Sequence, residues 1–100
     1  MREKLIEQKL VKAVKNRGGI CPKLVCPGFD GMPDRLVLLP DGNAGFVEVK
    51  APGQKPRLLQ VSRHKLLMSL GFQVFTLDDI TAIPRMLDEI GGERDNPSNG

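Results

Sequence analysis

The chain has 100 residues, a formal net charge of +3, no Trp or Tyr and 4 Phe. This length predicts one domain, and the shortage of aromatic rings disfavours a protein that binds nucleic acid by stacking bases. Neither an apolar run of about 18 residues nor an apolar leader is present, so we expect no membrane span, no secretory signal and a cytoplasmic location.

Seven secondary-structure elements are expected. Apolar residues at helical spacing, followed by Gly18-Gly19, predict a first helix over 3–17. The other elements are a strand over 20–26 with Pro22 at its edge, strands over 35–39 and 45–50 joined by the turn 40–43, a helix over 58–70, a strand over 72–77 and a helix over 81–90. The order α-β-β-β-α-β-α predicts an α/β domain with a mixed β-sheet flanked by helices.

The ends of the chain and its two cysteines complete this organisation. We assign residues 1–90 to a single domain and the polar, Gly- and Asn-containing stretch 91–100 to a disordered tail. Cys21 and Cys26 are expected as free thiols, because a structural zinc site would need a second pair of ligands and the lone His64 is distant in the sequence.

The turn at 40–43 brings three reactive side chains to one end of a hairpin. Folding the chain about it pairs residues whose numbers sum to about 83, so Asp34 is expected beside Glu48 and Lys50. Glu48 and Lys50 are two residues apart and point to one face of their strand. Two carboxylates beside an ammonium group could bind Mg²⁺ and cut a phosphodiester. The alternatives are a solvent-facing Glu48–Lys50 ion pair and an Asp34 that caps turn amides.

The first helix offers a further acid. On a helical projection Glu7 falls on the flank of the apolar arc, where it could reach the hairpin end, and Glu3 lies one turn earlier on the same side. The alternative is that these acids only interact favourably with the helix dipole near its N-terminus.

Basic residues gather around the same segments. From Val49 to Leu77 the chain has no Asp or Glu, but it carries Lys50 and the candidate DNA-binding residues Lys55, Arg57, Arg63 and Lys65, to which we add Arg35 next to Asp34. This distribution favours a polyanionic partner such as DNA. The alternative is a solvated lysine-rich surface.

Three short motifs together resemble one nuclease family. They are Gly31-Met32-Pro33-Asp34-Arg35, then Glu48-Val49-Lys50-Ala51-Pro52-Gly53 after twelve residues, and then Gln60. With the early helical Glu and the Gly-Gly that follows, they resemble the VRR-NUC branch of the PD-(D/E)xK nucleases, with their restriction-endonuclease-like core, and most of all the small stand-alone proteins of phages and prophages. The resemblance covers roughly residues 3–80.

The resemblance implies an Mg²⁺- or Mn²⁺-dependent phosphodiesterase. It assigns metal binding to Asp34 and Glu48 and catalysis to Lys50, and Glu7 (or Glu3) matches the acid of its first helix. From its place between Glu48 and Lys50, the carbonyl of Val49 could serve as a further ligand. Gln60 matches the glutamine that opens the second core helix and helps to hold the site. Stand-alone members of the family are homodimers that act on branched DNA such as four-way junctions, which implies the same for this chain.

These features lead to one principal hypothesis and its competitors. We expect a structure-selective DNA endonuclease, a dimeric Holliday-junction resolvase of phage or prophage origin. The alternatives are a DNA-binding module or inactive subunit with the same basic face, and a nuclease without junction preference. The dimer surface could lie on the exposed side of the first helix or on the apolar stripe of the last, namely Ile83, Met86, Leu87 and Ile90, unless that stripe packs on the sheet.

Overall fold

The computed structural model describes residues 2–92. Its helices are α1 (Glu3–Asn16), α2 (Leu58–Ser69) and α3 (Ile83–Ile90), its strands are β1 (Arg35–Leu38), β2 (Ala44–Val49) and β3 (Val74–Leu77), and its short 3-10 turns are η1 (Pro40–Gly42) and η2 (Ile80–Ala82). In the sheet order β1-β2-β3, β1 and β2 are antiparallel whereas β2 and β3 are parallel. The predicted mixed α/β architecture is therefore confirmed. The predicted tail over 91–100 lies, from residue 93 on, outside the described residues.

The strand predicted over 20–26 is not formed as a regular strand. The segment runs antiparallel to β1, but only two isolated bridges are present, Ile20 with Leu38 and Lys23 with Arg35. Between them the amide of Leu36 donates to the carbonyl of Pro22 over 3.1 Å. Pro22 has no N–H to donate in turn to the carbonyl of Leu36. The hydrogen-bond ladder between this segment and β1 is therefore interrupted at Pro22, and the regular sheet has three strands.

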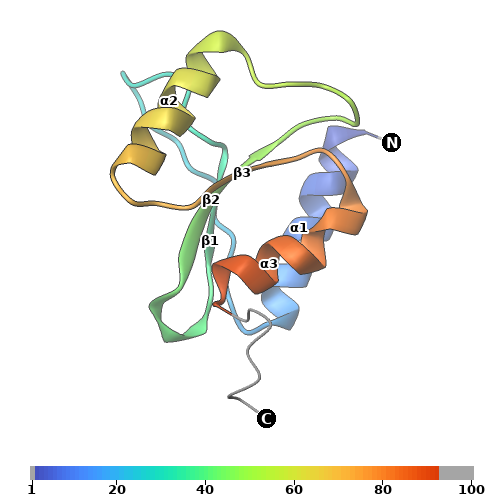
Figure 1. The fold of residues 1–100 in the computed structure, drawn as a ribbon. Coiled ribbons are helices and arrows are strands. Elements are labelled where there is room, and N and C mark those ends of the chain that lie inside the picture. Colours follow the sequence, from blue (N-terminus) through green and yellow to red (C-terminus); the bar gives the residue numbers. More distant parts are fainter. Residues whose placement is uncertain (1, 93–100) are drawn as a thin grey trace.

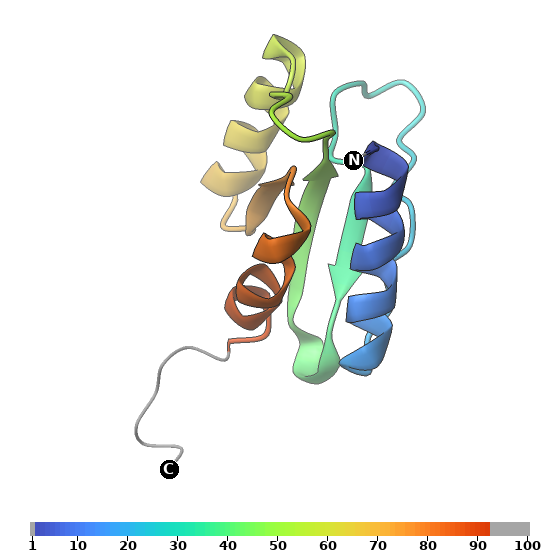
Figure 2. The same ribbon diagram turned by 90° about the vertical axis from the view of Figure 1, so that its right-hand side faces the viewer.

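The helices cover the two faces of the sheet unequally (Figures 1 and 2). α1 and α3 lie together on one face, and α2 lies on the other. The main apolar core is between the sheet and the first pair, where Ile6, Leu10 and Val14 of α1 meet Val47 and Val49 of β2. The apolar stripe of α3, namely Ile83, Met86, Leu87 and Ile90, is buried in this core. It therefore packs on the sheet, and the alternative in which this stripe forms a dimer surface is wrong.

Within residues 2–92 no helix is both long enough and apolar enough to cross a membrane.

Candidate active site

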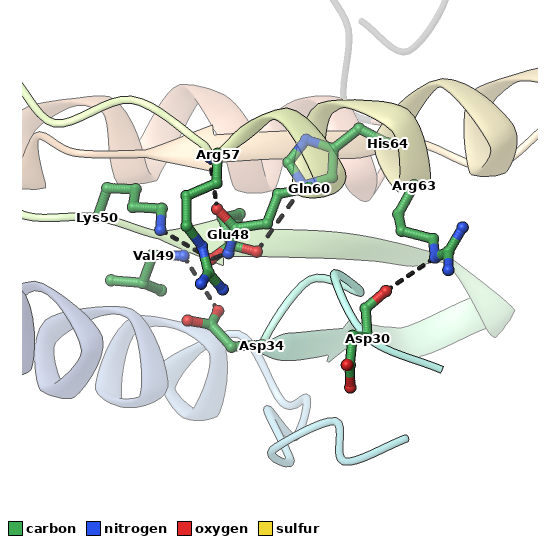
Figure 3. A network of polar contacts seen from close by, with 9 residues as sticks. All are labelled: Asp30, Asp34, Glu48, Val49, Lys50, Arg57, Gln60, Arg63 and His64. Atoms are coloured by element: carbon green, nitrogen blue, oxygen red, sulfur yellow. Dashed lines mark hydrogen bonds and ion pairs between the residues drawn. The ribbon is translucent and has the colours of Figure 1, made fainter. Parts of the chain in front are cut away.

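The hairpin places the predicted acids side by side. β1 and β2 pair Arg35 with Val47, so paired numbers sum to 82, one less than expected. Asp34 directly precedes Arg35 and Glu48 directly follows Val47, so the same register brings these two acids to one end of the hairpin. The amide of Val49 donates to Oδ1 of Asp34 over 3.0 Å. Nζ of Lys50 lies 3.6 Å from Oε2 of Glu48. Asp34, Glu48 and Lys50 therefore meet at one end of the hairpin, as Figure 3 shows.

Glu48 is buried beneath α2 rather than facing solvent. Its residue surface is only 3% exposed. Nε2 of Gln60 donates to Oε2 of Glu48 over 3.0 Å, whereas the other oxygen, Oε1, is buried and has no hydrogen-bond partner. This excludes the simple alternative of a surface Glu48–Lys50 ion pair. The alternative in which Asp34 only caps backbone amides holds for one of its oxygens, because Oδ1 accepts from the amide of Val49.

Both acids hold their protons more tightly than usual. Burial is the main cause that raises the pKa of Glu48 to about 7; the charge of Asp34 adds to it and Lys50 opposes it. Burial also raises the pKa of Asp34, against the hydrogen bond from the amide of Val49. Ionising both carboxylates is therefore costly unless a cation joins them.

α2 carries the side chains that cover Glu48, and one of them bonds to it. Oε1 of Gln60 accepts from the amide of Arg57 over 2.8 Å at the start of α2, while its Nε2 reaches Glu48. Gln60 thus links the helix N-terminus to the carboxylate, in line with the holding role that the resemblance implies. One turn later, the buried His64 places Nε2 at 3.8 Å from Oε1 of Glu48. Burial and the charge of Lys50 lower the pKa of His64.

His64 is the residue that sequence reasoning missed. Its distance from the cysteines argues against a zinc ligand, and the sequence assigns it no part in the site. A helix that places Gln60 over Glu48 must place the residue four positions later on the same face, and that spacing could have identified His64 as a neighbour of the site.

Glu7 does not join the other two acids. Its Oε2 lies 2.9 Å from Nε of Arg35, whose Nη1 also donates to the carbonyl of Cys21 over 2.8 Å. Across residues 2–92 no three His, Cys, Asp or Glu side chains form a group that could hold a metal ion. The expected set of three carboxylate ligands is therefore not assembled, because Glu7 is held by Arg35. Glu3, the alternative helix acid, is exposed.

The five candidate DNA-binding residues divide into two groups. Lys55, Arg57 and Lys65 are exposed, and Arg57 extends from the start of α2 toward the carboxylates (Figure 3). Arg63 donates to the carbonyl of Asp30 over 2.8 Å and its guanidinium carbon stands 3.9 Å from the ring centre of Phe29. Arg63 therefore contacts the loop that precedes Asp34, and Arg35 forms an ion pair with Glu7. These two arginines are bound within the protein, whereas the other three side chains are exposed.

The donor set suits a hard divalent cation. The bare Oε1 of Glu48 and the oxygen of Asp34 that does not accept from Val49 are hard ligands in a site that favours positive charge. Mg²⁺ usually takes only one or two protein carboxylates and keeps several waters. The residues present fit such an ion, with Asp34 and Glu48 as ligands and the carbonyl of Val49, which directly follows Glu48 in the chain, as a further candidate.

Two known proteins are similar to this chain, although no family model matches it. A protein of Acyrthosiphon pisum secondary endosymbiont phage 1, named "Putative nuclease p44", is 51% identical over 85 residues, which is 83% of this chain and 91% of the relative. A solved structure described as a VRR_NUC domain is 28% identical, with a TM-score of 0.81 over 88% of this chain and 97% of that one. The similarity thus extends over nearly the whole fold described above.

Proposed function

Because the chain belongs to the VRR-NUC family of PD-(D/E)xK nucleases, we propose that it is an Mg²⁺- or Mn²⁺-dependent endonuclease that cuts branched DNA. The observation that carries the metal dependence is the pairing of Asp34 with Glu48. The second of these acids is buried with one oxygen bare and a pKa raised to about 7. Such a carboxylate is poorly satisfied by its protein neighbours alone.

Each residue of the site has a proposed part in hydrolysis. Asp34 and Glu48 hold the cation, which would polarise the scissile phosphate and acidify water at the site. Lys50, fixed 3.6 Å from Glu48, orients the attacking water or stabilises charge that develops on the phosphate. Gln60 keeps the Glu48 side chain in place from α2 through its hydrogen bond, and His64 lies beside the other oxygen of Glu48 without bonding to it. A role of Glu7 as a further metal ligand stays a prediction, since Glu7 would first have to break its ion pair with Arg35.

A cleavage assay tests this proposal directly. Wild-type protein is incubated with four-way, flap and linear DNA at one salt concentration, with Mg²⁺, with Mn²⁺ or with chelator. Asp34→Asn and Lys50→Ala should each lower cleavage roughly a hundred- to a thousandfold, the scale expected when preorganised charge is removed from a reacting group. Asp41→Asn, at the other end of the same hairpin, is the matched control and should cut normally.

The assay also separates the competing hypotheses. Cleavage that survives in chelator or in Asp34→Asn would sink the metal-dependent mechanism. Binding of branched DNA without cleavage under any metal would favour a binding module or inactive subunit. Equal rates on four-way, flap and linear DNA would leave a nuclease without junction preference.

A dimer is proposed because one small domain covers little of a four-way junction, whereas a symmetric pair presents two sites. The apolar stripe of α3 is buried and the exposed side of α1 is rich in lysine, which leaves α2. Leu59 and Leu66 of α2 and Leu70 directly after it are exposed at helical spacing. Light scattering of the wild type and of Leu66→Arg should give the masses of a dimer and a monomer respectively. A monomeric wild type at micromolar concentration would contradict the proposal.

A cytoplasmic location in a bacterial host is proposed as well. It rests on the phage origin of the relative that is 51% identical.

A further inference from the structure

A groove runs along the outer side of α1, away from α2. Lys4, Gln8, Lys12 and Lys15 of the helix line it, Lys23 lines it from the segment that flanks β1, and Glu7, Val11 and Arg35 complete it. Its volume is about 570 Å³. Nothing in the assignment of Asp34, Glu48 and Lys50 uses this surface.

The groove carries a strong excess of positive charge. Its single carboxylate, that of Glu7, is already neutralised by Arg35 at 2.9 Å. Among the side chains of residues 2–92, no carboxylate lies within ion-pairing distance of Lys4, Lys12, Lys15 or Lys23. These four ammonium groups are exposed. They are therefore available to an anionic partner.

The spacing of the lysines suits an extended partner rather than a small one. Lys4 and Lys15 are eleven residues apart, which is about 16 Å along a helix. One strand of duplex DNA presents a phosphate every ~3.4 Å along its axis, so this length faces four or five phosphates. A single small phosphate would leave most of the row unused.

One end of the groove lies beside the candidate active site. Glu7 and Arg35 belong to its lining, Arg35 follows Asp34 in the chain, and the charge of Glu7 contributes to the raised pKa of Asp34. Figure 2 shows the start of α1 at the same end of the molecule as the end of β2. A strand that lies along α1 would therefore lead toward Asp34 and Glu48.

We propose that the groove formed by Lys4, Lys12, Lys15 and Lys23 binds the sugar-phosphate backbone of the DNA arm that leads to the cleavage site. The assignment rests on the proposed nuclease function for its substrate. The lysines contact phosphates and so position the duplex without reading its sequence.

The test measures DNA binding without cleavage, on the intact protein in chelator. Affinity for a four-way junction with long arms is determined between low and moderate salt for the wild type, Lys12→Gln/Lys15→Gln and Lys9→Gln/Arg85→Gln. Both variants remove two charges, but Lys9 and Arg85 do not line the groove. Thermal unfolding of each variant verifies that the fold is kept.

In the wild type, the logarithm of the DNA-binding constant should fall linearly with the logarithm of the salt concentration. The slope of this line should be shallower by about 0.9 for each phosphate contact removed, so by about 1.8 for Lys12→Gln/Lys15→Gln, with weaker binding to every sequence. The control variant should keep nearly the wild-type slope. Near-identical slopes and affinities for the two variants would overturn the proposal. So would a groove-specific loss of binding to heparin with no loss for DNA, because the groove would then serve another polyanion.

Cleavage then separates this proposal from the nuclease function. With Mg²⁺ and saturating DNA, the groove variant should keep the wild-type maximal rate, because its lysines lie outside the reacting centre. A large fall in that rate would assign the lysines to catalysis and overturn a purely binding role. A wild type that binds through the groove but never cuts would refute the nuclease function and leave the groove assignment intact.

Discussion

The two faces of β2 differ in what they bury. Toward α1 and α3 the strand presents Val47 and Val49, which are almost fully buried among aliphatic side chains. Toward α2 the residue between them, Glu48, is just as buried but meets Gln60 and His64. Apolar burial stabilises a fold, whereas burial of a carboxylate opposes it. α1 and α3 therefore stabilise the sheet, whereas α2 covers a site that is costly to keep charged.

The largest effect on stability is expected on the apolar face. Leu10→Ala removes a fully buried side chain of α1 and should lower the free energy of unfolding by about 2–5 kcal/mol. Denaturant unfolding measures this loss. The exposed Leu58→Ala in α2 is the control and should cost far less. A small loss at Leu10 would mean that this face does not hold the fold together.

The polar face should respond to pH instead. The pKa of Glu48 is about 7 in the folded chain and 4.5 without its surroundings. Between these values the folded state holds the proton more tightly, so the stability of metal-free protein should fall as pH rises, by at most about 3 kcal/mol. Glu48→Gln has no such proton and should therefore gain stability relative to the wild type between pH 5 and pH 8, while losing cleavage.

Thermal unfolding in chelator across that pH range checks the prediction. Glu89→Gln, an exposed acid of α3, serves as the control. Parallel curves for the wild type and Glu48→Gln would show that Glu48 is not strained by burial. At pH 8, Mg²⁺ should stabilise the wild type more than Glu48→Gln, since a bound ligand stabilises only the state that binds it.

A smaller effect should come from the side chain that joins α2 to Glu48. Gln60→Ala removes both the bond to Glu48 and the acceptor for the amide of Arg57. Loss of the helix-end contact should cost about 1 kcal/mol of stability, and loss of support for a ligand should weaken metal binding about 10–100-fold. Metal titration of cleavage and of thermal stability measures both. The exposed Gln54→Ala should change neither, and an equal effect there would remove the special role of Gln60.

The parts of the molecule that sequence reasoning predicted well depend on local geometry. The Asp41-Gly42 turn and the two-residue spacing of Glu48 and Lys50 were enough to bring these side chains to Asp34. The register was one residue off because it depends on the shape of the turn: the amide of Leu39 bonds to the carbonyl of Asn43, and Asp41 adopts a left-handed φ of 67°. Short polar side chains such as Asp tolerate this conformation.

The parts that were missed depend on side chains from distant segments. Periodicity placed Glu7 on the flank of the apolar side of its helix. It could not show that Arg35 would form an ion pair with this carboxylate and hold it away from Asp34 and Glu48. The sequence predicts a strand over 20–26 with Pro22 at its edge, but the missing amide of Pro22 leaves only two isolated bridges to β1. His64 was judged by its own chemistry rather than by its position one turn after Gln60.

The smallest effect on stability is expected for an ion pair between α1 and α3, the two helices that cover the apolar face of the sheet. Arg17 of the α1 end and Asp88 of α3 form an ion pair of 2.6 Å, but both side chains remain accessible to water. Exposed pairs of this kind contribute about 0–1 kcal/mol and are screened by salt. Asp88→Ala should therefore change the free energy of unfolding by less than about 1 kcal/mol, less still in 1 M salt, and leave cleavage unchanged. Arg17 would keep its bond to the carbonyl of Pro84. A loss as large as that of Leu10→Ala would show that α1 and α3 are joined by charge as much as by apolar packing, and the contrast between the two faces of the sheet would no longer hold.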